Sequence, residues 1–171
     1  MFWHLAMGFA KPPRVTSSKR SVELAMRCSL LDIDTYLHMN NAQYLRVAEL
    51  CRWRIFPATG IFAAAIKQRL MFLAVEQKIS YLKPIEALQK YVVSTTCDIY
   101  KDDKWLYYEH TFLQHPDEVP KDKEPQVFAK VVLRAVMKLP GGKTVKPSSH
   151  VGLSPFTHEL YKVHEEERSI E

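Results

Sequence analysis

The sequence predicts an α+β protein in which an antiparallel β-sheet packs against one helix. One alternating segment precedes a helical segment, four segments rich in β-branched and aromatic residues follow it, and polar turns separate them. A chain of 171 residues usually forms one domain with one sizeable core. The 47% of hydrophobic and 25% of charged residues are typical of a folded globular protein rather than a disordered one.

The first strand is predicted over residues 21–30. There Val22, Leu24, Met26 and Cys28 alternate with mostly polar residues, which is the period of a strand with one buried face. The chain therefore enters its most polar segment directly from a strand.

A helix is predicted over residues 41–56, and Pro57 and Gly60 should end it. Its apolar residues recur at helical spacing. They are Tyr44, Val47, Ala48, Cys51 and Ile55. Asn40 or Asn41 is expected to cap the first turn, because an Asn side chain accepts a hydrogen bond from an N–H two or three residues ahead.

Residues 61–70 predict a second, short helical segment, and strands follow it. The strands are predicted over residues 71–83, 89–101, 105–115 and 126–139. Residues 101–104 indicate a hairpin-like connection, and the three-proline segment 115–125 indicates an exposed loop.

Three parts are expected along the chain: an N-terminal extension over residues 1–20, a domain over 21–140, and a tail over 141–171 with a short helix from Pro155. The apolar run at the N-terminus is too short to span a bilayer. A cytoplasmic location is expected. Because the segment before Glu23 is basic and contains no acidic residue, mitochondrial import is the alternative.

The formal charge of +5 favours anionic partners in general. Nucleic acid is not expected, because the basic residues lack aromatic interleaving and zinc-finger spacing. The three cysteines form no CxxC pair, which indicates a reducing compartment, and Cys97 is interpreted as a packing residue rather than a nucleophile. The seven histidines form no HxxxH or HExxH pattern, so neither a metal site nor a cofactor is expected.

The polar residues near the predicted helix allow two interpretations each. Asp34 and His38 precede the helix, where free N–H groups and the helix dipole stabilise negative charge such as an oxyanion. They form either an oriented acid–base pair or a structural turn with a hydrogen-bonded histidine. Glu49 either pairs with Arg52 three residues later or points into a cleft.

The motif Asp-x-Asp-x-x-x-His-Met-Asn-Asn-Ala-x-Tyr-Leu-Arg at residues 32–46, with Glu49 and Arg52 after it, resembles the hotdog-fold thioesterases. It is most similar to the branch of thioesterase superfamily member 6. The resemblance implies a curled antiparallel β-sheet wrapped around a central α-helix, and a homodimer or dimer of dimers. It also implies hydrolysis of a fatty-acyl or aromatic acyl thioester of CoA, or of an acyl carrier, to the free acid.

The same resemblance implies roles for individual residues. Asp34 matches the nucleophile or general base of the 4-hydroxybenzoyl-CoA thioesterase-like branch, and N–H groups around residues 39–42 would polarise the thioester carbonyl. Further catalytic candidates are His38 and Glu49, and substrate-binding candidates are Asn40, Asn41, Tyr44 and Arg52.

Two positions depart from the family pattern. Many relatives carry Gly where this chain has Leu37, and plant acyl-carrier thioesterases carry a functional Asn where it has Tyr36. These bulkier residues motivate the alternative of a non-catalytic protein that binds acyl-CoA or lipid.

Overall fold

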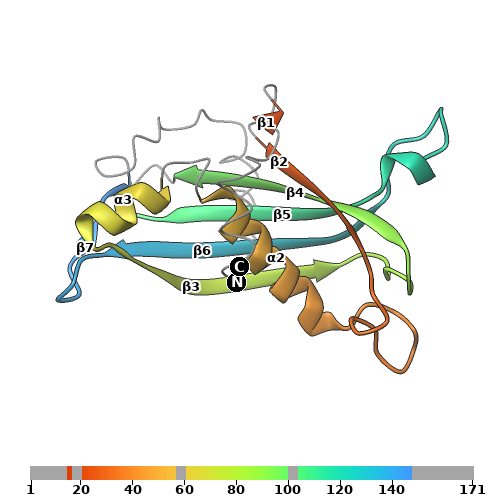
Figure 1. The fold of residues 1–171 in the computed structure, drawn as a ribbon, viewed down its shortest axis with the longest axis horizontal. Helices are drawn as coiled ribbons and strands as arrows, with labels where there is room; N and C mark the ends of the chain where they lie inside the picture. Colours follow the sequence, from red (N-terminus) through yellow and green to blue (C-terminus); the bar gives the residue numbers. More distant parts are fainter. Residues whose placement is uncertain (1–14, 17–20, 57–60, 100–103, 148–171) are drawn as a thin grey trace, which may run out of the picture.

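The computed structural model describes residues 15–16, 21–56, 61–99 and 104–147. It confirms the predicted class, since the strands of this part form one antiparallel sheet that is crossed on one face by helix α2 (Figure 1). The sheet curls around the helix without closing into a barrel.

Seven strands make up the sheet, in the order β1-β2-β4-β5-β6-β3, with β7 paired to β6. Their bounds are β1 Val15–Thr16, β2 Ser21–Arg27, β3 Met71–Tyr81, β4 Lys90–Ile99, β5 Leu106–Gln114, β6 Val127–Lys138 and β7 Thr144–Val145. The helices are α2 Asn41–Ile55, α3 Ile61–Gln68 and the 3-10 helix η1 Pro116–Glu118. Strand β3 follows the helices in sequence but lies beside β6, where it forms an edge of the sheet.

Helix α2 begins and ends close to the predicted residues. Asn40 is the N-cap, and its Oδ1 accepts a hydrogen bond from the Ala42 N–H at 2.9 Å. All five apolar residues expected on its inner face are buried, with exposed fractions of 6% or less. The helix is therefore held to the sheet by the stripe that its sequence predicts.

The core lies on both sides of the middle of α2. Around its first half, Met39, Tyr44 and Val47 pack with Phe112 and Val131 of the sheet. Around its second half and α3, a second cluster contains Ile55, Leu70, Leu106, Tyr108, Leu133, Ala135 and Met137. Burial of apolar surface in these clusters is the main source of stability.

The sheet follows the predicted strand pattern and extends beyond it at both ends. Burial alternates along β2 as expected, and β4 pairs with β5 across the predicted connection. The sheet also takes in β1 and, after a turn in which Gly141 and Gly142 have positive φ, β7, so it extends beyond residues 21–140 on both sides. The helix predicted from Pro155 lies outside the described residues.

Candidate functional site

The loop between β2 and α2 consists of two successive turns. The first spans Ser29–Asp32, where the Asp32 N–H donates to the Ser29 carbonyl at 3.0 Å and the Ser29 N–H donates to Asp32 Oδ2 at 2.9 Å. The second spans Asp34–Leu37. An isolated bridge between Ile33 and Met39 closes the second turn at its base. The loop is therefore a hydrogen-bonded structure that leads into the helix cap.

Asp34 is the residue around which the second turn is built. Its Oδ1 accepts the Tyr36 N–H at 2.8 Å, and its carbonyl accepts the Leu37 N–H at 3.1 Å. Its own N–H donates to the His38 carbonyl at 2.9 Å. Within the described residues Oδ2 of Asp34 has no hydrogen bond or ion pair, so one carboxylate oxygen is held and the other is available to a ligand.

A second loop, between β3 and β4, fixes the position of the first. The Met39 N–H donates to the Ile85 carbonyl at 2.8 Å, and the Ala87 N–H donates to the Leu37 carbonyl at 3.1 Å. Leu37 has φ of 61°, in the left-handed region that favours glycine. Its backbone conformation is therefore the one that the glycine of many relatives would adopt without strain.

A cleft of about 310 Å³ opens between these two loops and the start of α2. It is lined by Asp34, Tyr36, His38, Met39, Asn41, Tyr44, Tyr81, Leu82, Lys83 and Pro84. Tyr44 is 2% exposed and its ring contacts that of Tyr81 edge-on, at 5.3 Å between centroids. The cleft thus combines a carboxylate, a histidine and a lysine with aromatic walls.

Of the predicted site residues, the structure brings Asp34, His38, Asn41 and Tyr44 together on this cleft. His38 is half-buried and bridges to Glu86 through its backbone. Asp34 and His38 are joined through backbone atoms, and within the described residues no hydrogen bond or ion pair links their side chains.

The backbone N–H groups of residues 39–42 differ in their availability. The N–H of Met39, Asn40 and Ala42 already donate to Ile85, Asp32 and the Asn40 side chain, respectively. Asn41, the first residue of α2, has no hydrogen bond from its N–H to any described residue, as expected for a helix N-terminus. Within residues 39–42 this N–H is the available donor.

Glu49 and Arg52 do not line this cleft. Because a helix rises 1.5 Å per residue, Glu49 lies about 12 Å along α2 from Asn41. Both line a separate cavity of about 330 Å³ between α2, α3 and the sheet. Its other lining residues are Trp53, Phe56, Phe62, Ala65, Leu70, Phe72, Ala74, Tyr108, Leu133 and Ala135.

Of the two alternatives for Glu49, the ion pair with Arg52 is not formed, and Glu49 lines a cavity instead. Its carboxylate accepts a hydrogen bond from Trp53 Nε1 at 3.4 Å, and the half-buried Arg52 donates from Nη1 to His110 Nε2, also at 3.4 Å. Burial lowers the pKa of Arg52, and the nearby Glu49 charge opposes that shift. Arg52 is therefore a desolvated cation with a neutral partner.

Sequence reasoning missed His110 and Thr95. His110 is fully buried, and burial together with the Arg52 charge lowers its pKa to about 3. Thr95 is its cross-strand partner, with 2.9 Å between Oγ1 and His110 Nδ1. The signal was present, because His110 occupies an inward position in the alternating pattern of Leu106, Tyr108 and Phe112.

Neither a metal-binding cluster nor a helix able to span a membrane is found in the part of the chain that the structure describes. Within the described residues, His, Cys, Asp and Glu side chains form no group of three or more with the arrangement of a metal site. The helices of that part of the chain include none with the length and apolar character needed to cross a membrane.

Comparison with known proteins connects this geometry to a family. Residues 28–152 match the family model of the thioesterase-like superfamily. Protein THEM6 of Drosophila melanogaster is 30% identical over 91 residues, which are 53% of this chain and 47% of that protein. Protein THEM6 of Xenopus laevis is 29% identical over 87 residues, or 51% of this chain and 42% of that protein. The chain thus spans about half the length of the curated relatives it matches.

Solved structures share the fold at low sequence identity. YbaW, a probable thioesterase from Escherichia coli, superposes with a TM-score of 0.65 at 19% identity, covering 75% of this chain and 92% of that chain. The 4-hydroxybenzoyl-CoA thioesterase from Pseudomonas sp. strain CBS-3 gives a TM-score of 0.63 at 13% identity, covering 78% and 99%. The predicted hotdog fold is confirmed, and the chain belongs to the thioesterase-like superfamily.

Proposed function

We propose that this protein is an acyl-CoA thioesterase that hydrolyses a fatty-acyl or aromatic acyl thioester at the Asp34 cleft. The observation that carries the proposal is the state of the Asp34 carboxylate. One oxygen is fixed by the Tyr36 N–H while the other is free of protein partners in the described part of the chain. The fold relatives named as CoA thioesterases support the same reaction class.

In the proposed reaction, the thioester carbonyl lies between Asp34 and the start of α2. Asp34 either attacks the carbonyl carbon, giving an anhydride that water hydrolyses, or takes a proton from an attacking water. In both routes the C–S bond breaks, the CoA thiolate leaves and takes up a proton, and the acyl group becomes the free acid. The oxyanion would be bound by the Asn41 N–H at the positive end of the helix dipole.

The other cleft residues would bind and orient the substrate. His38 lines the cleft beside Asp34, and in this proposal it holds a water or the thioester by hydrogen bonding. Asn40 is committed to the cap, so its contribution is to fix the first turn of α2. Lys83 supplies a cation at the cleft that suits the phosphates of CoA.

A homodimer is part of the proposal. Strand β3 is an edge strand, and Met71, Leu73 and Val75 on it are 43%, 43% and 50% exposed. A long edge strand with exposed apolar residues is a template for pairing with another chain. Pairing of β3 with β3 of a second copy would satisfy its open hydrogen-bonding groups and cover these side chains.

A non-catalytic acyl-CoA-binding protein is the second candidate. Tyr36 lines the cleft and is 80% exposed, so it stands at the opening, at the position where plant acyl-carrier thioesterases carry a functional Asn. This position lets Tyr36 cover a bound ligand and restrict the access of water.

A hydrolysis screen separates the two functions. Short, long and aromatic acyl-CoAs are offered to the wild-type chain and to Asp34→Ala and Glu49→Ala, with thiol release as the readout. We expect turnover by the wild type, loss in Asp34→Ala, and retention in Glu49→Ala, since Glu49 lies outside the cleft. Binding of acyl-CoA without turnover of any substrate would instead establish the second candidate.

A further inference from the structure

Large apolar side chains protrude from the loops that carry the Asp34 cleft. Leu30, Leu31, Tyr36 and Leu37 are 64%, 91%, 80% and 65% exposed, and Leu88 of the neighbouring loop is 52% exposed. We call these five residues the apolar tip. Leu30 and Leu31 occupy the two central positions of a tight turn, where Gly, Pro, Asn, Asp and Ser dominate.

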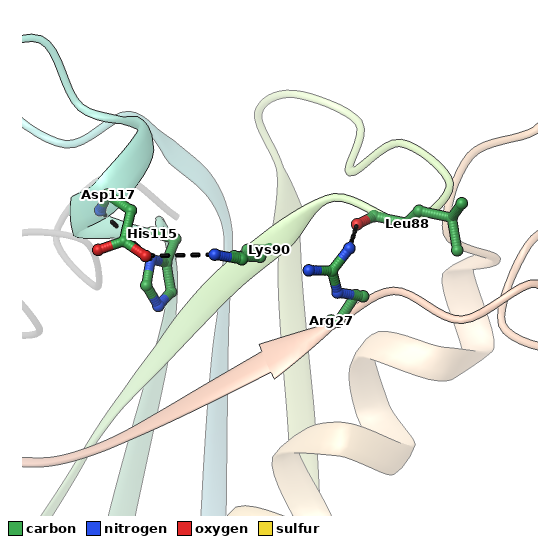
Figure 2. A network of polar contacts seen from close by, with 5 residues as sticks. All are labelled: Arg27, Leu88, Lys90, His115 and Asp117. Atoms are coloured by element: carbon green, nitrogen blue, oxygen red, sulfur yellow. Dashed lines mark hydrogen bonds and ion pairs between the residues drawn. The ribbon is translucent and has the colours of Figure 1, made fainter.

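The apolar tip is held rigidly by backbone hydrogen bonds. The Leu37 carbonyl accepts the Ala87 N–H at 3.1 Å, and the Leu88 N–H donates to the Cys28 carbonyl at 2.9 Å. Arg27 Nη1 donates to the Leu88 carbonyl at 3.1 Å, and Figure 2 shows the Leu88 side chain extending away from this contact. The backbone of Leu37 and Leu88 is therefore fixed by contacts between the two loops, while their side chains face solvent.

Two members of the apolar tip also adopt an unfavourable backbone conformation. Leu37 and Leu88 have φ of 61° and 63°, where a side chain with a Cβ is strained. Neither leucine gains burial in return, since both remain more than half exposed. Strained residues concentrate where a protein makes functional contacts, so a surface that covers the apolar tip would account for them.

The shape and charge of this region fit a bilayer surface better than a protein partner. The five side chains stand on three separate turns, 29–32, 34–37 and 86–89. This region has no excess of positive charge, since its charged residues are Arg27, Lys83, Asp32, Asp34 and Glu86. Apolar side chains with an aromatic hydroxyl among them, on a base without excess positive charge, match the headgroup–acyl boundary of a zwitterionic bilayer rather than an anionic one.

The position of the apolar tip adds a link to the cleft. Tyr36 belongs to both, and Leu82, 56% exposed, lines the cleft beside it. A bilayer in contact with the apolar tip would therefore lie at the opening of the cleft. An acyl thioester is amphiphilic and partitions into such a bilayer, so it would enter from the lipid side.

We propose that the apolar tip inserts into the headgroup region of a zwitterionic phospholipid bilayer and docks the Asp34 cleft on that surface. Insertion depends only on the apolar tip and not on catalysis. Entry of an acyl thioester from the bilayer, by contrast, rests on the proposed function.

Vesicle co-sedimentation with the full chain tests the insertion. The probe is phosphatidylcholine vesicles, with the wild type compared with a Leu30→Ser, Leu31→Ser double variant. Loss of two leucine side chains from the interface should weaken binding by about tenfold or more. The matched control is Ile66→Ser on α3, at the other end of the molecule (Figure 1), because Ile66 is 65% exposed and Leu30 is 64%. It should bind like the wild type.

Salt dependence and oligomeric state distinguish insertion into a bilayer from other uses of the apolar tip. Binding should change by less than about twofold when salt is raised from about 0.05 M to about 0.5 M, because apolar insertion is not screened. Absence of wild-type binding, or equal losses in the double variant and in Ile66→Ser, would overturn the proposal. A change of oligomeric state in the double variant, measured by light scattering, would assign the apolar tip to a second copy instead.

The assay does not depend on catalysis, so the two proposals fail separately. Vesicle binding without thioester hydrolysis would remove the proposed function and keep the docking surface. Hydrolysis of water-soluble short-chain acyl-CoA, unchanged in the double variant, without vesicle binding would do the reverse.

Discussion

Arg52 Nη1 lies 3.4 Å from His110 Nε2, and this contact fixes the protonation of the buried histidine. Arginine has only donors, so Nε2 must accept and the ring proton must sit on Nδ1. Nδ1–H then donates to Thr95 Oγ1 at 2.9 Å. The two hydrogen bonds, from His110 to Thr95 and from Arg52 to His110, thus orient the Arg52 side chain at the helix–sheet cavity without neutralising its charge.

This arrangement predicts a loss of stability at mildly acidic pH. Burial and Arg52 lower the pKa of His110 to about 3 in the folded chain, against about 6.5 in an unfolded one. Between these values the unfolded chain binds a proton that the folded chain does not, so the free energy of unfolding rises with pH. The contribution lost between about pH 7.5 and about pH 5 is roughly 2 kcal/mol.

Urea unfolding of the wild type and His110→Gln at these two pH values isolates that contribution. The difference in stability between the two proteins should shrink by about 2 kcal/mol at the lower pH. His115→Gln is the matched control, since His115 caps η1 near the surface. A pH-independent difference for His110→Gln would show that the histidine does not titrate as the contact requires.

The two adjacent asparagines should differ in their effect on stability. Asn40 accepts the Ala42 N–H, so Asn40→Ala should lower the free energy of unfolding by about 1 kcal/mol. Asn41 is an exposed first residue of the helix, and Asn41→Ala should change stability by less than about 0.5 kcal/mol. Chemical denaturation of the pair measures the difference, and equal losses would contradict the assignment of Asn40 as the cap.

Replacing Leu37 with glycine should make the folded protein more stable. Its left-handed backbone costs an L-residue about 1–2 kcal/mol, and the added freedom of an unfolded glycine offsets only part of the gain. Leu37→Gly should therefore raise the free energy of unfolding by about 0.5–1 kcal/mol, whereas the β-branched Leu37→Val should lower it by about 1 kcal/mol or more. Thermal unfolding measures both changes, and the opposite order would contradict the strain.

The proposed dimer depends on the edge strand β3. Charged side chains on an edge block its pairing with another chain, so a Leu73→Lys, Val75→Lys double variant should be monomeric where the wild type is dimeric. Light scattering reads the mass directly. Ile66→Lys places a lysine on an exposed apolar position of α3, away from β3, and should leave the dimer intact. Dissociation by both changes would indicate a general effect of charge instead.

The sequence was informative where one local pattern decides the structure. The alternation of β2 and the apolar stripe of α2 each determine which face is buried, and both were predicted correctly. The cap was predicted as one of two asparagines. The choice between them depends on where the loop enters the helix, which the Asp32 carbonyl settles by accepting the Asn40 N–H.

What was not predictable depends on contacts between distant segments. Glu49 and Arg52 are near each other in sequence, yet Trp53 takes the carboxylate and His110, 58 positions further on, takes the guanidinium. The strain at Leu37 arises because the β3–β4 loop holds its carbonyl. The family pattern grouped Asp34 with Glu49, whereas the length of α2 separates them within one chain.

The rate of thioester hydrolysis by Asp34→Asn tests the central claim most directly. An asparagine keeps the Oδ1 that accepts the Tyr36 N–H, so the turn is retained while the charged oxygen is lost. With Asp32→Asn as the matched change in the preceding turn, we expect kcat/KM of Asp34→Asn to fall by at least about a hundredfold while the control stays near the wild type. A correctly folded Asp34→Asn protein that hydrolyses acyl-CoA at the wild-type rate would contradict the assignment of this cleft as the catalytic site.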